Sequence, residues 1–211
     1  MDAVMIDTVN LDRRRLLTTA TAGTAAVGFA FATGPFLASW KLNARAKAFG
    51  NPVEIDVGKL EAGQMLKVIW RGQAIYVVRR TAAMIDQLSN HDELLLDPQS
   101  NDSAQPDYIK SQGAARARNP EYWVGSAICT HAGCSPIGAP RANDAHQLTG
   151  VDLGEKWPGG FYCPCHGSKY DLSGRVFKNM PAPRNLPIPD YAIINLTRVL
   201  IGAATVPKPV V

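Results

Sequence analysis

Two short segments of the sequence contain every cysteine of the chain and two of its four histidines. The first reads Cys-Thr-His-Ala-Gly-Cys at residues 129–134, and the second reads Cys-Pro-Cys-His-Gly-Ser at residues 163–168. In each segment a histidine follows a cysteine within three residues, so each could offer one thiolate and one imidazole to a common metal centre. Glycine and proline let the backbone turn tightly enough for two such loops to converge.

Three kinds of site fit these residue types. Two structural disulfides would use all four cysteines, but they would give the repeated Cys/His pattern no role. A tetrahedral zinc site could use one cysteine and one histidine from each segment, although zinc sites usually show longer spacings. A [2Fe–2S] cluster could use the same four residues, with the cysteines on one iron and the histidines on the other. The four candidate ligands are Cys129, His131, Cys163 and His166.

The paired segments closely resemble the ligand motifs of Rieske iron–sulfur proteins. The resemblance implies that Cys129 and Cys163 ligate one iron of a [2Fe–2S] cluster, and that His131 and His166 ligate the other. One cluster per chain is expected.

The two remaining cysteines resemble the additional pair of the high-potential Rieske proteins in quinol-oxidising cytochrome bc complexes. By this resemblance Cys134 and Cys165 form a disulfide that ties the two loops together, which requires an oxidising compartment.

The resemblance extends beyond the cysteine motifs. Ser168 and Tyr170 stand where the family places hydroxyl groups that donate hydrogen bonds to cluster sulfurs, which raises the reduction potential. Residues 180–183, Met-Pro-Ala-Pro, resemble the family's proline-rich loop, although the family usually has glycine where Met180 stands. Ala132 is a second departure, because the family typically has leucine at that place.

The expected fold is an all-β, Rieske-type antiparallel sandwich at residues 53–211, with a small cluster-binding subdomain at about residues 124–183. Short runs rich in valine, isoleucine and aromatic residues alternate with turn residues. Residues 81–88 predict a short helix or turn, and the polar residues 97–120 predict a long excursion from the core. The expected strands are 53–57, 65–70, 74–80, 124–128, 147–151, 160–163, 175–177, 192–197 and 199–202.

Two histidines lie outside the motifs. His146 falls in the stretch 135–162, which is longer than in many proteins of the resembled family, and it is expected on a surface loop. His91, between Asn90 and Asp92, is expected to be a solvated turn residue.

The N-terminal region predicts a membrane anchor. Residues 16–40 carry no charged side chain, and a helix of that length would reach about 37 Å, more than the ~30 Å hydrocarbon core of a bilayer. Trp40 and Lys41 would end the span with an interfacial aromatic residue and a cation. The segment is rich in threonine and poor in leucine, so its tendency to insert is weak.

The arginines at 13–15 directly before the span resemble a twin-arginine export signal, while an ordinary start-transfer anchor is the alternative. We expect a retained single-pass anchor with residues 1–15 as a cytoplasmic tail. Residues 41–52 would form a flexible tether, and the domain would lie on the periplasmic side of a bacterial inner membrane.

The overall composition excludes several classes of protein. Apolar residues make up 46% and charged residues 19% of 211 residues, which excludes a disordered chain. A mean hydropathy of −0.09 excludes a polytopic membrane protein but allows a single span. The net charge of +4 is small and scattered, so no nucleic-acid partner is expected.

Tail, span, tether and domain together resemble the iron–sulfur subunit of bacterial quinol:cytochrome c oxidoreductases. The resemblance implies an electron carrier that takes an electron from quinol, with a proton through a histidine ligand, and passes the electron to a c-type cytochrome. His166 would meet the quinol, and His131 would be the second exposed ligand. The complex would contribute to proton translocation in a respiratory or photosynthetic chain.

The implied partners are a cytochrome b subunit, a c-type cytochrome subunit and the lipid bilayer, within a dimeric complex. The alternative is the Rieske electron-transfer subunit of a periplasmic metalloid oxidase of the arsenite-oxidising type.

Overall fold

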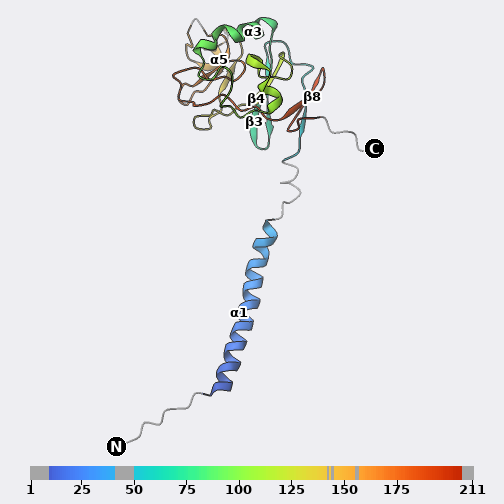
Figure 1. The fold of residues 1–211 in the computed structure, drawn as a ribbon, viewed down its shortest axis with the longest axis vertical. Coiled ribbons are helices and arrows are strands. Elements are labelled where there is room, and N and C mark those ends of the chain that lie inside the picture. The colour runs from blue at the N-terminus through green and yellow to red at the C-terminus, as the bar shows by residue number, and fades with distance from the viewer. Residues whose placement is uncertain (1–9, 41–49, 142, 144, 155–156, 206–211) are drawn as a thin grey trace, which may run out of the picture. The chain divides into compact units, whose positions relative to one another are not determined.

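The structure is a computed structural model that describes residues 10–40, 50–141, 143, 145–154 and 157–205. The chain divides into two units, residues 1–48 and residues 49–211 (Figure 1). Most of the expected tether, residues 41–49, lies outside the described residues.

The first unit contains one long helix, α1 (Leu11–Ser39). The side chain of Asn10 caps it by accepting a hydrogen bond from the amide of Arg13 at 3.0 Å. The helix therefore begins before the arginines and earlier than the uncharged segment. It is long and apolar enough to cross a membrane, a property that it shares with signal sequences near an N-terminus.

Five of the six hydroxyl groups that weaken the hydropathy of α1 are bonded within the helix. Each donates to a backbone carbonyl three or four residues earlier in the chain. A hydroxyl that is satisfied in this way costs less to bring into hydrocarbon than a free one. The residues are Thr18, Thr19, Thr24, Thr33 and Ser39.

The second unit is built on three antiparallel sheets of three strands each. The sequence predicted an antiparallel β fold but not this division into three sheets. The core has one part between the first two sheets and another between the second sheet and the third, which carries the cysteine-containing loops. In spatial order the strands are β1 (Val53–Asp56), β9 (Arg198–Ile201) and β8 (Tyr191–Asn195); β2 (Met65–Trp70), β3 (Gln73–Arg79) and β4 (Tyr122–Ser126); and β5 (Ile137–Ala139), β6 (Gly160–Tyr162) and β7 (Lys169–Tyr170).

Strand β3 lies between β2 and β4 and separates two parts of the core. Arg71 and Gly72 both have positive φ, 51° and 72°, which suits the two-residue turn between β2 and β3. Because side chains alternate along a strand, Tyr76 packs in the cluster of residues around the cysteines, and Val77 packs in the cluster that contains β8 and β9. The cysteine loops thus rest on one face of a buried strand.

The short helices connect the sheets. Residues 81–88, predicted as a short helix or turn, contain α3 and continue into a 3-10 helix, and the polar stretch 97–120 contains two more short helical turns. The helices are α3 (Ala82–Asp86), η1 (Gln87–Leu94), α4 (Asp107–Lys110), η2 (Gly113–Ala115) and α5 (Ala145–Thr149).

The strand predicted at residues 147–151 is wrong, because these residues overlap α5. The helix ends at Gly150, whose φ of +71° and amide bond to the carbonyl of His146 at 2.8 Å are typical of a helix C-terminus. His146 is exposed, as expected, but on this helix. The strand predicted at 175–177 is reduced to two isolated bridges.

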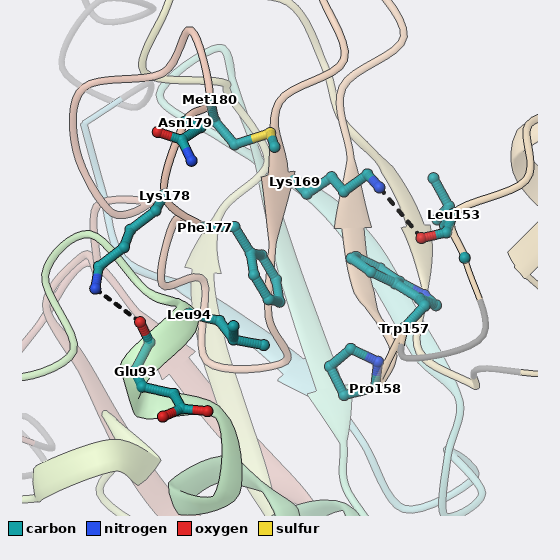
Figure 2. A pocket seen from close by; sticks show the side chains of 11 residues that line it. Glu93, Leu94, Leu153, Trp157, Pro158, Lys169, Phe177, Lys178, Asn179 and Met180 are labelled. Carbon is teal, nitrogen blue, oxygen red and sulfur yellow. Dashed lines mark hydrogen bonds between the residues drawn. The ribbon is translucent and has the colours of Figure 1, made fainter.

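Residues 135–162 form a small core of their own. Leu153 and Trp157 are buried together, and Phe177 packs against them. The rings of Trp157 and Phe177 lie 5.9 Å apart and line a cavity of about 540 Å³ that Met180 also lines (Figure 2). This stretch therefore covers the side of the domain next to the proline-rich loop.

Candidate metal centre

The two cysteine-containing segments adopt the same turn. In each, the amide of the first cysteine donates to the carbonyl five residues later, and the amide of a glycine donates back to the carbonyl of that cysteine. Both glycines have a φ of +79°, which favours glycine at these positions. The four bonds join Cys129 N to Cys134 O at 2.7 Å, Gly133 N to Cys129 O at 3.0 Å, Cys163 N to Ser168 O at 2.8 Å, and Gly167 N to Cys163 O at 2.9 Å.

The small sheet β5–β6–β7 brings these loops together. The second loop connects β6 to β7, and the first loop runs into β5, which pairs with β6. A disulfide joins Cys134 to Cys165 across the two loops, with their Cα atoms 6.6 Å apart, as the resemblance implied. Cys129 and Cys163 are free and buried, so the hypothesis of two structural disulfides is wrong.

The histidines of the two loops lie side by side at the surface. The ring centroids of His131 and His166 are 4.6 Å apart, and the ring planes are nearly perpendicular, at 84°. Both residues are exposed, in contrast to the buried thiols of Cys129 and Cys163. The loops thus present two free thiols inside and two imidazoles outside, a donor set of the kind that a mixed Cys/His iron–sulfur cluster requires.

Tyr170 contacts the sulfur of Cys129. Its phenol oxygen lies 3.1 Å from the Sγ and accepts a hydrogen bond from the amide of Thr130 at 3.2 Å. Burial raises the pKa of Tyr170 far above its usual range, so the phenol keeps its proton and can donate it in a hydrogen bond to a thiolate.

The two thiols differ in their acidity. Burial raises the pKa of Cys163 above its usual value. At Cys129 burial also acts to raise the pKa, but hydrogen bonds, first from Tyr170 and also from Ser168, outweigh it and lower the pKa. Hydrogen bonding to the charged form favours the thiolate, and a coordinating thiol is deprotonated outright. Of the two residues predicted to donate to cluster sulfurs, Tyr170 lies within hydrogen-bonding distance of the sulfur of Cys129.

Ser168 also joins the second loop to the proline-rich loop. Its side chain is fully buried, and its Oγ accepts a hydrogen bond from the amide of Ala182 at 3.1 Å. Met180 packs against the core around the cysteines, while Ala132 is exposed.

A third sulfur lies near the disulfide. The Sγ atoms of Cys134, Cys163 and Cys165 lie within 4.8 Å of one another. Because the sulfurs of a disulfide are not free thiolates, this group is not itself a set of metal ligands. It shows instead how closely the disulfide approaches a candidate ligand.

His91 is not the solvated turn residue that was expected. It is only 8% exposed, and its Nε2 lies 3.3 Å from the Oδ2 of Asp171. The backbone of His91 departs from helical geometry within η1, with φ −127°, and its ring stacks on Phe177 with centroids 5.9 Å apart. The polar neighbours Asn90 and Asp92 suggested exposure, but the irregular backbone turns the ring inward.

A buried turn follows Tyr170, and it was not foreseen. Asp171 is fully buried and accepts hydrogen bonds from the amides of Ser173 and Arg175 and from the Nε of Arg175 at 2.8 Å. Burial acts to raise the pKa of Asp171, but Arg175 first and His91 next outweigh it and lower the pKa. The i,i+4 spacing of Asp171 and Arg175 is a signal in the sequence, but ion pairs on exposed helices have the same spacing.

The fold and the paired loops define a small β domain that is suited to a mixed thiolate–imidazole metal centre. The Rieske [2Fe-2S] domain family matches residues 52–192 of the chain. The chain belongs to this family, which contradicts the zinc hypothesis.

Curated relatives match nearly the whole chain. The ubiquinol-cytochrome c reductase iron-sulfur subunit of Allochromatium vinosum is 50% identical over 194 residues, 92% of this chain and 90% of the relative. The subunit of the same name from Blastochloris viridis is 40% identical over 198 residues, 93% of this chain and 96% of the relative. A chain of the solved structure titled "Hyperthermophilic respiratory Complex III" is 22% identical with a TM-score of 0.45, covering 86% of this chain and 98% of that chain.

Proposed function

We propose that this chain is the membrane-anchored iron–sulfur subunit of a quinol–cytochrome c reductase, an electron carrier within that complex. The main support is the pair of loops, tied by the Cys134–Cys165 disulfide, that places His131 and His166 side by side at the surface. Relatives that carry this subunit's name match more than nine-tenths of the chain, a share that must include most of α1. They disfavour the alternative of a metalloid oxidase subunit.

We assign Cys129 and Cys163 as ligands of one iron of a [2Fe–2S] cluster, and His131 and His166 as ligands of the other. The assignment is supported by the two free, buried thiols and the two exposed, adjacent imidazoles. It leaves the remaining cysteine pair for the disulfide.

When bound, the cluster supplies one-electron redox chemistry. Tyr170 and Ser168 donate hydrogen bonds toward the sulfur of Cys129, which stabilises added negative charge there. The ring nitrogen of His166 that does not bind iron would accept a proton from the quinol hydroxyl, and His131 would flank it.

In this function a cytochrome b subunit holds the quinol, and a c-type cytochrome subunit accepts the electron, within a dimeric complex. Residues 16–40 cross a bacterial inner membrane once, with residues 1–15 in the cytoplasm and the domain at 53–211 in the periplasm. The tether at 41–52 would let the domain move between the two partners.

The test uses the full chain, purified anaerobically from its own membranes. A reduced sample should show the low average g-value of a His-ligated [2Fe–2S] cluster in electron paramagnetic resonance (EPR), and b- and c-type haem should co-purify. His166→Ala should abolish quinol-dependent reduction of cytochrome c, whereas His146→Ala, at an exposed histidine outside the motifs, should not. A chain without the cluster signal, or full activity in His166→Ala, would contradict the proposal.

A further inference from the structure

Three arginines are buried in the domain behind Tyr170. Arg80 and Arg116 are each 1% exposed, and Arg175 is fully buried. Arginine is almost never buried this deeply unless a carboxylate pairs with it. Arg175 follows that rule, because it bonds Asp171 and Asp92.

Arg80 bonds only neutral acceptors among the described residues. Its guanidinium donates to the carbonyl of Pro120 at 2.8 Å, the hydroxyl of Ser173 at 2.7 Å and the carbonyl of Ala115 at 3.0 Å. These bonds satisfy its hydrogen-bonding groups, but they do not neutralise its charge.

Arg116 has the same kind of surroundings within the part of the chain that the structure describes. Its guanidinium donates to two side chains and two backbone carbonyls, all of them uncharged. The acceptors are Gln105 Oε1 at 3.1 Å, Ser103 Oγ at 2.6 Å, Ser173 O at 2.7 Å and Leu186 O at 3.0 Å.

Both side chains remain cationic at neutral pH. Burial lowers the pKa of Arg80 and of Arg116 to about 10, still well above 7. Asp171 is fully buried and bonds Arg175, whereas Asp92, which also bonds Arg175, and Asp97, which attracts the charge of Arg116, are partly exposed. Among the described residues behind Tyr170, buried positive charge therefore exceeds buried negative charge, which costs stability because the charge is removed from water.

A short series of contacts links the surplus charge to the metal centre. Arg80 and Arg116 both bond Ser173, three residues after Tyr170, and Cα atoms at that spacing are at most about 10 Å apart. The phenol of Tyr170 in turn lies 3.1 Å from the Sγ of Cys129. Salt screens charges in the interior only weakly, so the field of the two cations extends to the ligand loops.

We propose that Arg80 and Arg116 raise the reduction potential of the iron–sulfur cluster, because their charge favours its reduced state. The inference rests on the proposed ligand assignment. With two thiolate and two neutral imidazole ligands, the cluster is neutral when both irons are ferric. One electron from an external donor makes one iron ferrous and leaves the cluster singly negative, while no bond forms or breaks.

The test is a redox titration of the full chain in detergent, followed by EPR at pH 6. Arg80→Met removes the charge, and Arg80→Lys keeps it while also losing the guanidinium's bonding geometry. We expect the ratio of reduced to oxidised cluster at a fixed solution potential to fall about fivefold or more in Arg80→Met, and to stay within about twofold of wild type in Arg80→Lys. Arg116→Met and Arg116→Lys should behave in the same way.

Two further variants separate charge from other effects. Arg184→Gln removes an exposed arginine side chain that pairs with Asp102. Arg184 lies near the first loop, because its backbone carbonyl accepts a hydrogen bond from the hydroxyl of Thr130. The substitution should cause only a small shift that disappears at high salt. Ser173→Asp places a carboxylate where the Ser173 hydroxyl accepts from Arg80, beside the backbone carbonyl that accepts from Arg116. It should lower the reduced fraction, and it remains informative if a methionine variant fails to fold.

If the reduced fraction of the cluster fell equally in the lysine and methionine variants, the proposal would be overturned, because hydrogen bonding alone would then explain the effect. A redox titration of the folded methionine variants, or of Ser173→Asp, that matched the wild-type titration would also overturn it. These outcomes differ from failure of the proposed function, in which the wild-type chain itself would lack the cluster signal.

Discussion

The phenol oxygen of Tyr170 lies 3.1 Å from the Sγ of Cys129 and joins the first ligand loop to the buried turn that follows strand β7. The amide of Thr130 donates to the same oxygen, so the phenol's own proton is directed elsewhere. Burial raises the pKa of Tyr170 far above its usual range, and the proton is therefore present throughout the physiological range. The Sγ of Cys129, a candidate ligand, and the Oγ1 of Thr130 at 3.2 Å both lie within reach of that proton.

Tyr170→Phe should lower the reduction potential and leave the cluster bound. The lost hydrogen bond to a charged acceptor is worth about 1.5 kcal/mol or more, and a tenfold change in a one-electron equilibrium corresponds to about 59 mV. A redox titration should therefore show a decrease of about 60 mV. Tyr108→Phe, which removes a phenol that bonds Tyr191 instead, should not change the potential; equal potentials in wild type and Tyr170→Phe would refute the role.

Removal of the disulfide by replacing Cys134 and Cys165 with serine should destabilise the metal centre. The two cysteines are 31 residues apart, and closing a loop of that length contributes about 3–4 kcal/mol in the chain-entropy account. We expect a lower melting temperature and faster loss of iron on mild heating, followed by visible absorbance. If the double variant kept its iron as well as the wild type does, the sheet β5–β6–β7 would be sufficient to hold the loops without the disulfide.

The meeting of the two cysteine-containing loops was more predictable than their surroundings, and the reason is physical. Their cysteines and histidines lie in two short segments, so the pattern can be read locally in the sequence. Strand β2 matches its predicted bounds, 65–70, because it is a continuous β-rich run that ends at a tight turn. The burial of His91 and Arg80 depends on contacts with residues far away in sequence, and no local pattern encodes it.

Asp171→Asn should reduce stability at neutral pH and make it less sensitive to acid. The pKa of Asp171 in the folded protein lies below its ordinary value, despite the opposing effect of burial, because Arg175 and His91 favour the carboxylate. A depressed pKa contributes stability that is present above about pH 4 and is lost as the pH falls through the folded-state pKa.

The asparagine variant lacks this contribution at every pH. We expect a loss of about 3–5 kcal/mol at pH 7, because Arg175 loses a buried partner. The gap between wild type and variant should narrow below pH 4, as measured by urea unfolding at several pH values. A gap that stays constant down to pH 2 would contradict this linkage.

Gly160→Ala should disrupt the metal centre far more than Gly167→Ala, although both glycines have positive φ. A Cβ on Gly160 would lie 2.0 Å from the backbone oxygen of Tyr170, so β7 would have to move and carry Tyr170 away from Cys129. A Cβ on Gly167 meets nothing within 4 Å, and the cost is only the backbone strain of about 1–2 kcal/mol. Iron content per chain should therefore fall sharply in Gly160→Ala. In Gly167→Ala it should remain near the wild-type value, and only the melting temperature should decrease modestly. If both variants retained full iron content, the close approach of β6 and β7 would not be what holds Tyr170 against the ligand sulfur.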